Sequence, residues 1–127
     1  MNTRKHGFSL VEVLAAVSII GVITFLALPN IIAVKGDAET SLAIARAEAV
    51  NIALANFIQS YGRTNATSSW AATTSDQDRY ALVASYLAFA PSSESDYMPN
   101  GYGLTWPSSI ATLSKIGLTG PSGSIAY

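Results

Sequence analysis

The chain contains no cysteine and only one histidine, His6, among its 127 residues. Without cysteine, disulfide bonds, thiolate metal sites and thiol catalysis are excluded. The many serines have no histidine base beyond position 6, and no carboxylate pair has the spacing of an acid–base site. A glycine-rich phosphate-binding loop is also missing. The sequence therefore predicts a protein that is not an enzyme and that needs no cofactor or metal ion.

Charge is scarce as well. Charged residues make up 12% of the chain, against roughly 25% in an average soluble domain. Seven basic and eight acidic side chains give a net charge of −1. No basic patch is present to hold a phosphate backbone, so nucleic-acid binding through charge is not expected. The apolar excess lies in the first third of the chain, which indicates a membrane anchor followed by one small domain.

Residues 8–34 form an almost wholly apolar run, and 22 uncharged residues separate Glu12 from Lys35. A helix rises about 1.5 Å per residue, so this run is long enough to cross a hydrocarbon core roughly 30 Å thick. Arg4 and Lys5 precede the run and favour a leader on the cytoplasmic side. The predicted topology is a single span with the C-terminal part outside.

Two simpler interpretations of this run are a conventional secretory signal and a plain uncleaved anchor. A conventional secretory signal has an apolar region of about 7–15 residues, and the run here is much longer. The small-residue cleavage site that it offers, near Ala27, is a poor one because Leu28 and Pro29 follow. A plain uncleaved anchor leaves Glu12 unexplained, because a carboxylate at the centre of an apolar span costs on the order of 2.5–3.5 kcal/mol. Glu12 either marks the membrane edge or meets a positive group supplied by another molecule.

The string KHGFSLVEVL, residues 5–14, resembles the processing site of type IV prepilins and type II secretion pseudopilins. That family has a basic leader ending in glycine, then a hydrophobic residue, then glutamate as the fifth residue after the cut. The resemblance implies that a membrane aspartyl peptidase, the prepilin peptidase, cuts between Gly7 and Phe8. It implies further that the new amine of Phe8 is methylated and that Glu12 pairs with the N-terminal amine of a neighbouring subunit during assembly.

Gly21 and Pro29 also lie where this family carries helix-weakening residues. Glycine lowers helix stability by about 1 kcal/mol relative to alanine, and proline removes one backbone hydrogen bond. The resemblance implies local melting of the helix between them in a filament. Glycine and proline are also common in membrane helices, where they can simply mark a bend.

Apolar residues recur at spacings of three and four over residues 38–61, which predicts an amphipathic helix ended by Gly62. This stripe consists of Ala43, Ala47, Val50, Leu54, Phe57, Ile58 and Tyr61. Polar residues 63–69 are predicted to form a loop. Ser75 is the predicted N-cap of a second helix over residues 76–89, with Tyr80, Val83, Ala84 and Leu87 on its apolar face.

The last third of the chain predicts short strands at residues 102–106, at 110–114 and near 124–126. Residues 91–101 are predicted to be a loop. Its Glu94 and Asp96 suggest Ca²⁺ binding only weakly, because no dense Asp/Asn pattern accompanies them. Asn65 begins a glycosylation triplet of a kind that is common by chance.

The predicted fold class is therefore α+β: a long N-terminal helix, half membrane-spanning and half amphipathic, packed by a small C-terminal head with a second helix and a short antiparallel sheet. The predicted divisions are a leader at residues 1–7, a transmembrane and assembly helix at 8–34, and a head at 35–127. The head includes the amphipathic continuation of the helix.

The function predicted from the resemblance is that of a structural subunit of a type IV pilus or a secretion pseudopilus. The implied partners are identical or homologous subunits, the prepilin peptidase, and the bacterial inner membrane with its assembly platform. The head would lie in the periplasm, or outside the cell in a finished filament. The alternative is a membrane-anchored extracytoplasmic binding or adhesion module that does not assemble. Roles in adhesion, competence and secretion all fit this sequence. Many adhesive pilins carry a pair of cysteines, and the absence of cysteine here favours a pseudopilin or minor pilin.

Overall fold

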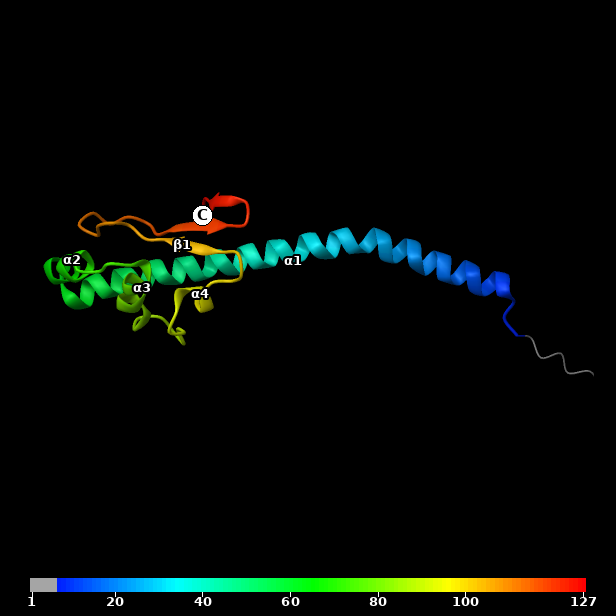
Figure 1. Cartoon of the computed structure of the whole chain (residues 1–127), viewed down its shortest axis with the longest axis horizontal. Helices are drawn as coiled ribbons and strands as arrows, with labels where there is room; N and C mark the ends of the chain where they lie inside the picture. Colours follow the sequence, from blue (N-terminus) through cyan, green and yellow to red (C-terminus); the bar gives the residue numbers. More distant parts are fainter. Residues whose placement is uncertain (1–6) are drawn as a thin grey trace, which may run out of the picture. The chain divides into compact units, whose positions relative to one another are not determined.

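A computed structural model of the chain describes residues 7–127 (Figure 1). The predicted leader, apart from Gly7, lies outside the described residues, and so does His6. Two compact units divide the chain between Asp37 and Ala38. The elements are α1 (Leu10–Tyr61), α2 (Arg63–Ala71), α3 (Asp76–Ala84), α4 (Glu94–Tyr97), β1 (Gly103–Thr105), β2 (Gly117–Gly120) and β3 (Gly123–Ile125).

The second half of α1 supplies one wall of the head's core, as its apolar stripe predicted. Its buried residues are Ala43, Ala47, Val50, Ala53, Leu54 and Phe57. Of the two remaining stripe positions, Ile58 is half-buried and Tyr61, in the last turn, is 51% exposed. The helix ends at the predicted point because Gly62 has φ 78, a backbone conformation that glycine adopts without steric cost.

The loop predicted at residues 63–69 is wrong, because this segment forms most of helix α2. Ala66 and Trp70 lie four residues apart and are 0% and 1% exposed, so burial of one face stabilises a helix of polar composition. The hydroxyls of Thr67 and Ser68 donate to the carbonyls four residues earlier, at 2.7 and 3.0 Å. These bonds satisfy side chains that would otherwise compete for the backbone.

Helix α3 begins as predicted and ends earlier than predicted. The Ser75 hydroxyl accepts a hydrogen bond from the Asp78 N–H at 3.2 Å, which confirms Ser75 as the N-cap. Tyr80 and Val83 are buried on the predicted face. The helix ends at Ala84 rather than at residue 89, because the next N–H groups bond to carbonyls only three residues back and tighten the chain into turns.

The sheet is antiparallel, in the order β1-β2-β3, with Leu118 of β2 opposite Leu104 on one side and Ile125 on the other. The strands predicted at residues 102–106 and near 124–126 are confirmed as β1 and β3. The strand predicted at 110–114 is wrong, since the strand that pairs with both is β2. Residues 111–115 are exposed, while Ile110 and Ile116 on either side of them are buried.

Within residues 38–127, the sheet lies on one side of α1 and helices α3 and α4 lie on the other (Figure 1). On the sheet side, Asn51 of α1 accepts the Ile116 N–H at 2.9 Å and donates to the Tyr127 hydroxyl at 2.8 Å. On the opposite side, the Arg46 guanidinium donates to the Tyr97 carbonyl. The predicted α+β fold is thus confirmed, and hydrogen bonds from α1 hold both layers of a head that has no cysteine.

Candidate processing and assembly site

The start of helix α1 is fixed by a local hydrogen bond at Ser9. Its hydroxyl accepts the Glu12 N–H at 3.2 Å, and its carbonyl accepts the Val13 N–H at 3.1 Å, so Ser9 is the N-cap. The sequence Ser-Leu-Val-Glu has the spacing of a capping box, in which a serine N-cap is followed three residues later by glutamate. A carboxylate in the first turn is also favoured by the helix dipole.

The predicted cleavage bond lies just outside this helix. Gly7 and Phe8 are not helical, Phe8 is 89% exposed, and a side chain at Gly7 would meet open space. Exposed chain that is not held by a helix is the kind of segment a peptidase can bind in extended form. The cap at Ser9 thus leaves the Gly7–Phe8 bond accessible while the apolar run behind it is helical.

Glu12 lies in the first turn of α1 and is exposed. Within residues 7–127 its carboxylate makes no ion pair or hydrogen bond. Among these residues, only the dipole at the N-terminus of α1 stabilises its negative charge. Phe8 lies four residues before Glu12, just outside the same end of the helix. A cut after Gly7 therefore places a new ammonium group beside the helix end that carries this carboxylate.

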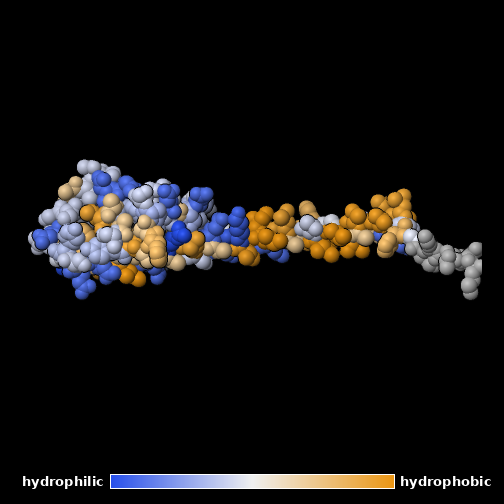
Figure 2. Space-filling model, turned by 90° about the horizontal axis from the view of Figure 1, so that it is seen from below, coloured by the Kyte–Doolittle hydropathy of each residue, from blue (hydrophilic) through white to orange (hydrophobic). Residues whose placement is uncertain are grey.

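The apolar part of α1 presents its side chains outward (Figure 2). In the described part of the chain, α1 is the one helix that is long and apolar enough to cross a membrane, and none of its apolar stretch is buried inside the molecule. The helix of a soluble core would be covered by its own chain. Two polar side chains within the stretch, Ser18 and Thr24, donate to the Leu14 and Ile20 carbonyls at 2.7 and 2.8 Å, which satisfies them in an apolar surrounding.

Helix α1 is continuous through both Gly21 and Pro29. Pro29 offers no N–H to the carbonyl of Phe25, so one hydrogen bond of the ladder is missing there. The space beside Gly21 is open, and no close approach of another part of the chain explains a glycine at this position. The weakening of the helix at these two residues in a filament stays a prediction.

The loop predicted at residues 91–101 contains the short helix α4, and both carboxylates of this segment, half-buried Glu94 and exposed Asp96, accept hydrogen bonds. Both oxygens of Glu94 accept hydrogen bonds, from the Leu104 N–H at 3.1 Å and the Trp106 indole N–H at 2.9 Å. Asp96 accepts from the Ser93 hydroxyl at 2.8 Å. In the part of the chain that the structure describes, no group of three acidic or histidine side chains is placed to hold a metal ion.

Comparison with known proteins agrees with the geometry of this N-terminus. Residues 2–28 match the family described as the prokaryotic N-terminal methylation motif. The chain is also similar to the type IV major pilin protein PilA of Myxococcus xanthus (strain DK1622), with 30% identity over 90 residues. That alignment covers 71% of this chain and 34% of PilA, so the chain spans about a third of the length of this relative. No solved structure matches the chain.

The N-terminal segment thus carries the prepilin-type methylation motif, as its leader, Gly7, Phe8 and Glu12 predicted. The motif and the distant similarity to PilA are those of a pilin-like structural protein and not of an enzyme. One signal in the sequence was missed. The Ser9–Glu12 spacing of a capping box marks Ser9 as the N-cap of α1, and the Glu12 N–H bonds to its hydroxyl.

Proposed function

We propose that the chain is a subunit of a type IV pilus or of a secretion pseudopilus. It is made as a precursor, cut between Gly7 and Phe8 by prepilin peptidase, and methylated on the Phe8 amine. It then assembles through helix α1 with identical or homologous subunits. The observation that supports this most directly is the exposed Gly7–Phe8 bond placed immediately before a capped apolar helix with Glu12 in its first turn.

The anchor explains how the precursor is presented to the peptidase. Residues 8–34 hold it in the bacterial inner membrane, and Arg4 and Lys5 keep the leader on the cytoplasmic side. The head lies in the periplasm, and the assembly platform moves the anchor from the lipid into a filament. In the filament the exposed apolar side chains of α1 pack against those of other subunits rather than against lipid.

Cleavage creates the charge that assembly uses. The new ammonium at Phe8 lies beside the N-terminus of α1, where the positive end of the helix dipole disfavours it. A neighbouring subunit, staggered along the filament axis, offers its Glu12 as the counter-charge. In a bundle of apolar helices the effective dielectric constant is low, so a paired amine and carboxylate attract strongly and an unpaired one is costly. The pair therefore sets the register between subunits.

The test is the mass of the intact N-terminus in the native host, measured on membrane fractions and on sheared filaments. The mature chain is expected to begin at a methylated Phe8. Loss of residues 1–7 removes two of seven basic side chains, so five basic against eight acidic groups give a formal charge of −3.

A matched precursor with Gly7→Val is expected to stay uncut, because the side chain added at the cleavage position would block the peptidase. Chains that all begin at Met1, in a host with an active prepilin peptidase, would reject processing. They would favour the anchored binding or adhesion module instead, which keeps its leader.

A further inference from the structure

Ser9 caps the N-terminus of α1 without help from the Glu12 side chain. The Ser9 hydroxyl accepts the Glu12 N–H at 3.2 Å. A full capping box has a second bond, from the glutamate carboxylate back to the N–H of the serine. In the part of the chain that the structure describes, the Glu12 carboxylate makes no hydrogen bond. Of these two side chains, the one that bonds to the first turn of the helix is therefore Ser9.

The first residue of the helix decides what surrounds the bond between Gly7 and Phe8. In an α-helix each N–H bonds to the carbonyl four residues earlier. Extension of α1 by one residue toward the N-terminus would pair the Glu12 N–H with the Phe8 carbonyl. Extension by two residues would pair the Val11 N–H with the Gly7 carbonyl, which is the carbonyl that a peptidase has to attack. A longer helix would therefore occupy the oxygen at the cleavage position.

Without the Ser9 hydroxyl, this longer helix is favoured over a frayed end. A backbone N–H that lacks a partner in apolar surroundings is costly, and the helix offers the Glu12 N–H the Phe8 carbonyl as a replacement acceptor. The extension would meet no obstacle from the rest of the described chain, because the space beside Gly7 is open and Phe8 is 89% exposed. What opposes it is the Ser9 cap, together with the low helix propensity of glycine.

We propose that Ser9 is a positioning residue for the cleavage between Gly7 and Phe8. Its hydroxyl holds the start of α1 at Leu10, two residues after the bond that is cut. The Gly7 carbonyl is thereby kept out of the helical hydrogen bonds, and the chain around it can bind a peptidase in extended form. Ser9 acts through the backbone and not through contact with the enzyme. The inference rests on the proposed function, because it concerns the processing step.

The kinetics of cleavage test this role on the full-length precursor in detergent micelles, with purified prepilin peptidase and mass spectrometry of the intact chain. When only part of the substrate is in the conformation that binds, the apparent affinity falls by that fraction. The KM of Ser9→Ala is therefore expected to rise by up to about fivefold, the factor that corresponds to the stabilisation of a helix start by an N-cap. Its kcat should stay close to the wild-type value.

Ser18→Ala is the matched control. It removes a serine hydroxyl from the same apolar run, but this hydroxyl donates to the Leu14 carbonyl at 2.7 Å and lies beyond the first turn of the helix. Both variants lose one hydroxyl, so they change the transfer of the segment into the micelle equally. Ser18→Ala should leave KM and kcat unchanged.

Two variants that lack the Ser9 hydroxyl distinguish the helix start from a direct contact with the peptidase. Ser9→Asn replaces the hydroxyl by a side chain of another shape that caps equally well. The double variant Ser9→Ala, Leu10→Pro fixes the helix start with no capping side chain. Proline is favoured as the first residue of a helix, and it disfavours the helical conformation of the residue before it. Both variants should return KM to near the wild-type value.

An unchanged KM in Ser9→Ala, beside normal cleavage of the wild type, would overturn the inference and leave the proposed function standing. A raised KM that neither Ser9→Asn nor the proline variant lowers would also overturn it, because the hydroxyl would then act by contact with the peptidase. A wild-type precursor that the peptidase does not cut would instead reject the proposed function.

Discussion

The indole Nε1 of Trp106 lies 2.9 Å from Oε2 of Glu94, and the other oxygen of that carboxylate accepts the Leu104 N–H at 3.1 Å. One side chain of the short helix α4 thus holds both the first strand and the residue that follows it. Trp106 in turn contacts Trp70 and Tyr80, with ring centroids 5.9 and 6.5 Å away. Glu94 therefore connects the edge of the sheet to the aromatic core of the head.

Residues 38–127 are predicted to fold without the anchor. Every buried apolar residue of the core lies in this range, from Ala43 to Leu118. The fragment should be a soluble monomer that unfolds in one cooperative step, with a free energy of unfolding on the order of 5 to 10 kcal/mol. Circular dichroism during urea titration and sedimentation velocity would measure both properties.

A shorter fragment that begins at Val50 serves as the control. It lacks Ala43 and Ala47 of the core and the Arg46 hydrogen bond to Tyr97, so it should not unfold cooperatively. If residues 38–127 aggregate or unfold without a transition, the head depends on the anchor.

Removal of the Glu94 carboxylate is predicted to destabilise the fragment of residues 38–127 strongly. Glu94→Ala leaves the Leu104 N–H and the Trp106 indole without their acceptor, and hydrogen bonds to charged groups contribute about 1.5–3 kcal/mol each. The expected loss in free energy of unfolding is on the order of 3 kcal/mol. Glu94→Gln keeps one acceptor oxygen and should lose roughly half as much. Urea denaturation gives both values.

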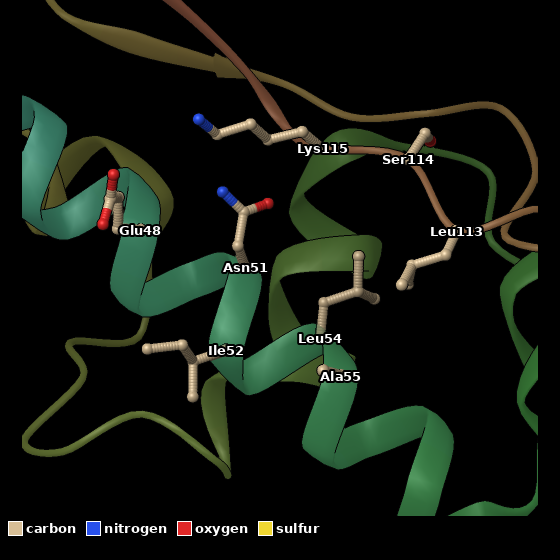
Figure 3. A pocket seen from close by; sticks show the side chains of 8 residues that line it. All are labelled: Glu48, Asn51, Ile52, Leu54, Ala55, Leu113, Ser114 and Lys115. Atoms are coloured by element: carbon tan, nitrogen blue, oxygen red, sulfur yellow. The ribbon is translucent and has the colours of Figure 1, made fainter. Parts of the chain in front are cut away.

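The matched control is Glu48→Ala, which removes an exposed carboxylate of α1 (Figure 3) with no hydrogen-bond or ion-pair partner in the described part of the chain. Its effect should stay within about 0.5 kcal/mol. Equal losses at the two positions would show that the Glu94 contacts contribute little in solution.

Asp78 is predicted to make the head less stable in acid. Hydrogen bonds lower the pKa of this carboxyl below its ordinary value of 3.8. The largest contribution comes from the Thr74 hydroxyl, followed by the Thr74 backbone and then by the side chain and backbone of Ser75. A lowered folded-state pKa stabilises the fold above the unfolded-state pKa, and this contribution is lost as the pH falls through the folded-state value. Asp78→Asn should remove this part of the acid sensitivity.

The comparison is Asp76→Asn, which changes a neighbouring carboxylate of the same helix turn. Thermal unfolding between pH 2 and neutral pH measures the loss of head stability in acid. Asp76→Asn should retain the part of this loss that depends on Asp78, and Asp78→Asn should not. Parallel curves for wild type and Asp78→Asn would argue against the assignment.

The sequence predicted the elements whose signals are local. The spacing from Ala43 to Phe57 marks the buried face of α1, because helical period and burial coincide there. Ser75 marked the start of α3 because capping depends on residues within one turn. The methylation motif could likewise be identified from the sequence, because its residues Gly7, Phe8 and Glu12 have a fixed spacing along one segment.

The elements that were missed depend on residues distant in the sequence. Strand β2 contains two glycines and one buried leucine, a weak strand signal, and it is a strand because Leu118 pairs with both Leu104 and Ile125. The hydrogen bond from the Ile116 N–H to Asn51 links positions 65 residues apart. No local pattern encodes such a partner.

Glu12 is predicted to be needed for assembly and not for insertion or cleavage. Insertion should survive Glu12→Ala because the loss of a charge lowers the cost of placing the segment in the membrane. Cleavage should survive because the peptidase binds mainly the exposed residues beside Gly7. Assembly should fail because the Phe8 ammonium of the neighbour would enter an apolar bundle without a counter-charge, and an unpaired buried charge costs about 3–5 kcal/mol.

Two further variants separate this ion pair from the capping of α1 at Ser9. Glu12→Gln retains the capping-box pattern, which accepts glutamine, but loses the charge. Ser9→Ala removes the hydroxyl that accepts the Glu12 N–H, at a cost of about 1 kcal/mol to the helix start, and keeps the charge. If the pair acts between subunits, Glu12→Gln should reduce assembly nearly as much as Glu12→Ala, and Ser9→Ala should reduce it little.

The measurement is the yield of sheared filaments, or secretion output, relative to the mature subunit in the membrane. The opposite ranking, with normal filaments from Glu12→Gln and few from Ser9→Ala, would assign Glu12 to the start of α1 alone. Since both glutamine and glutamate can cap but only glutamate can neutralise an ammonium group, the order of these two yields distinguishes a contact within one chain from a contact between chains.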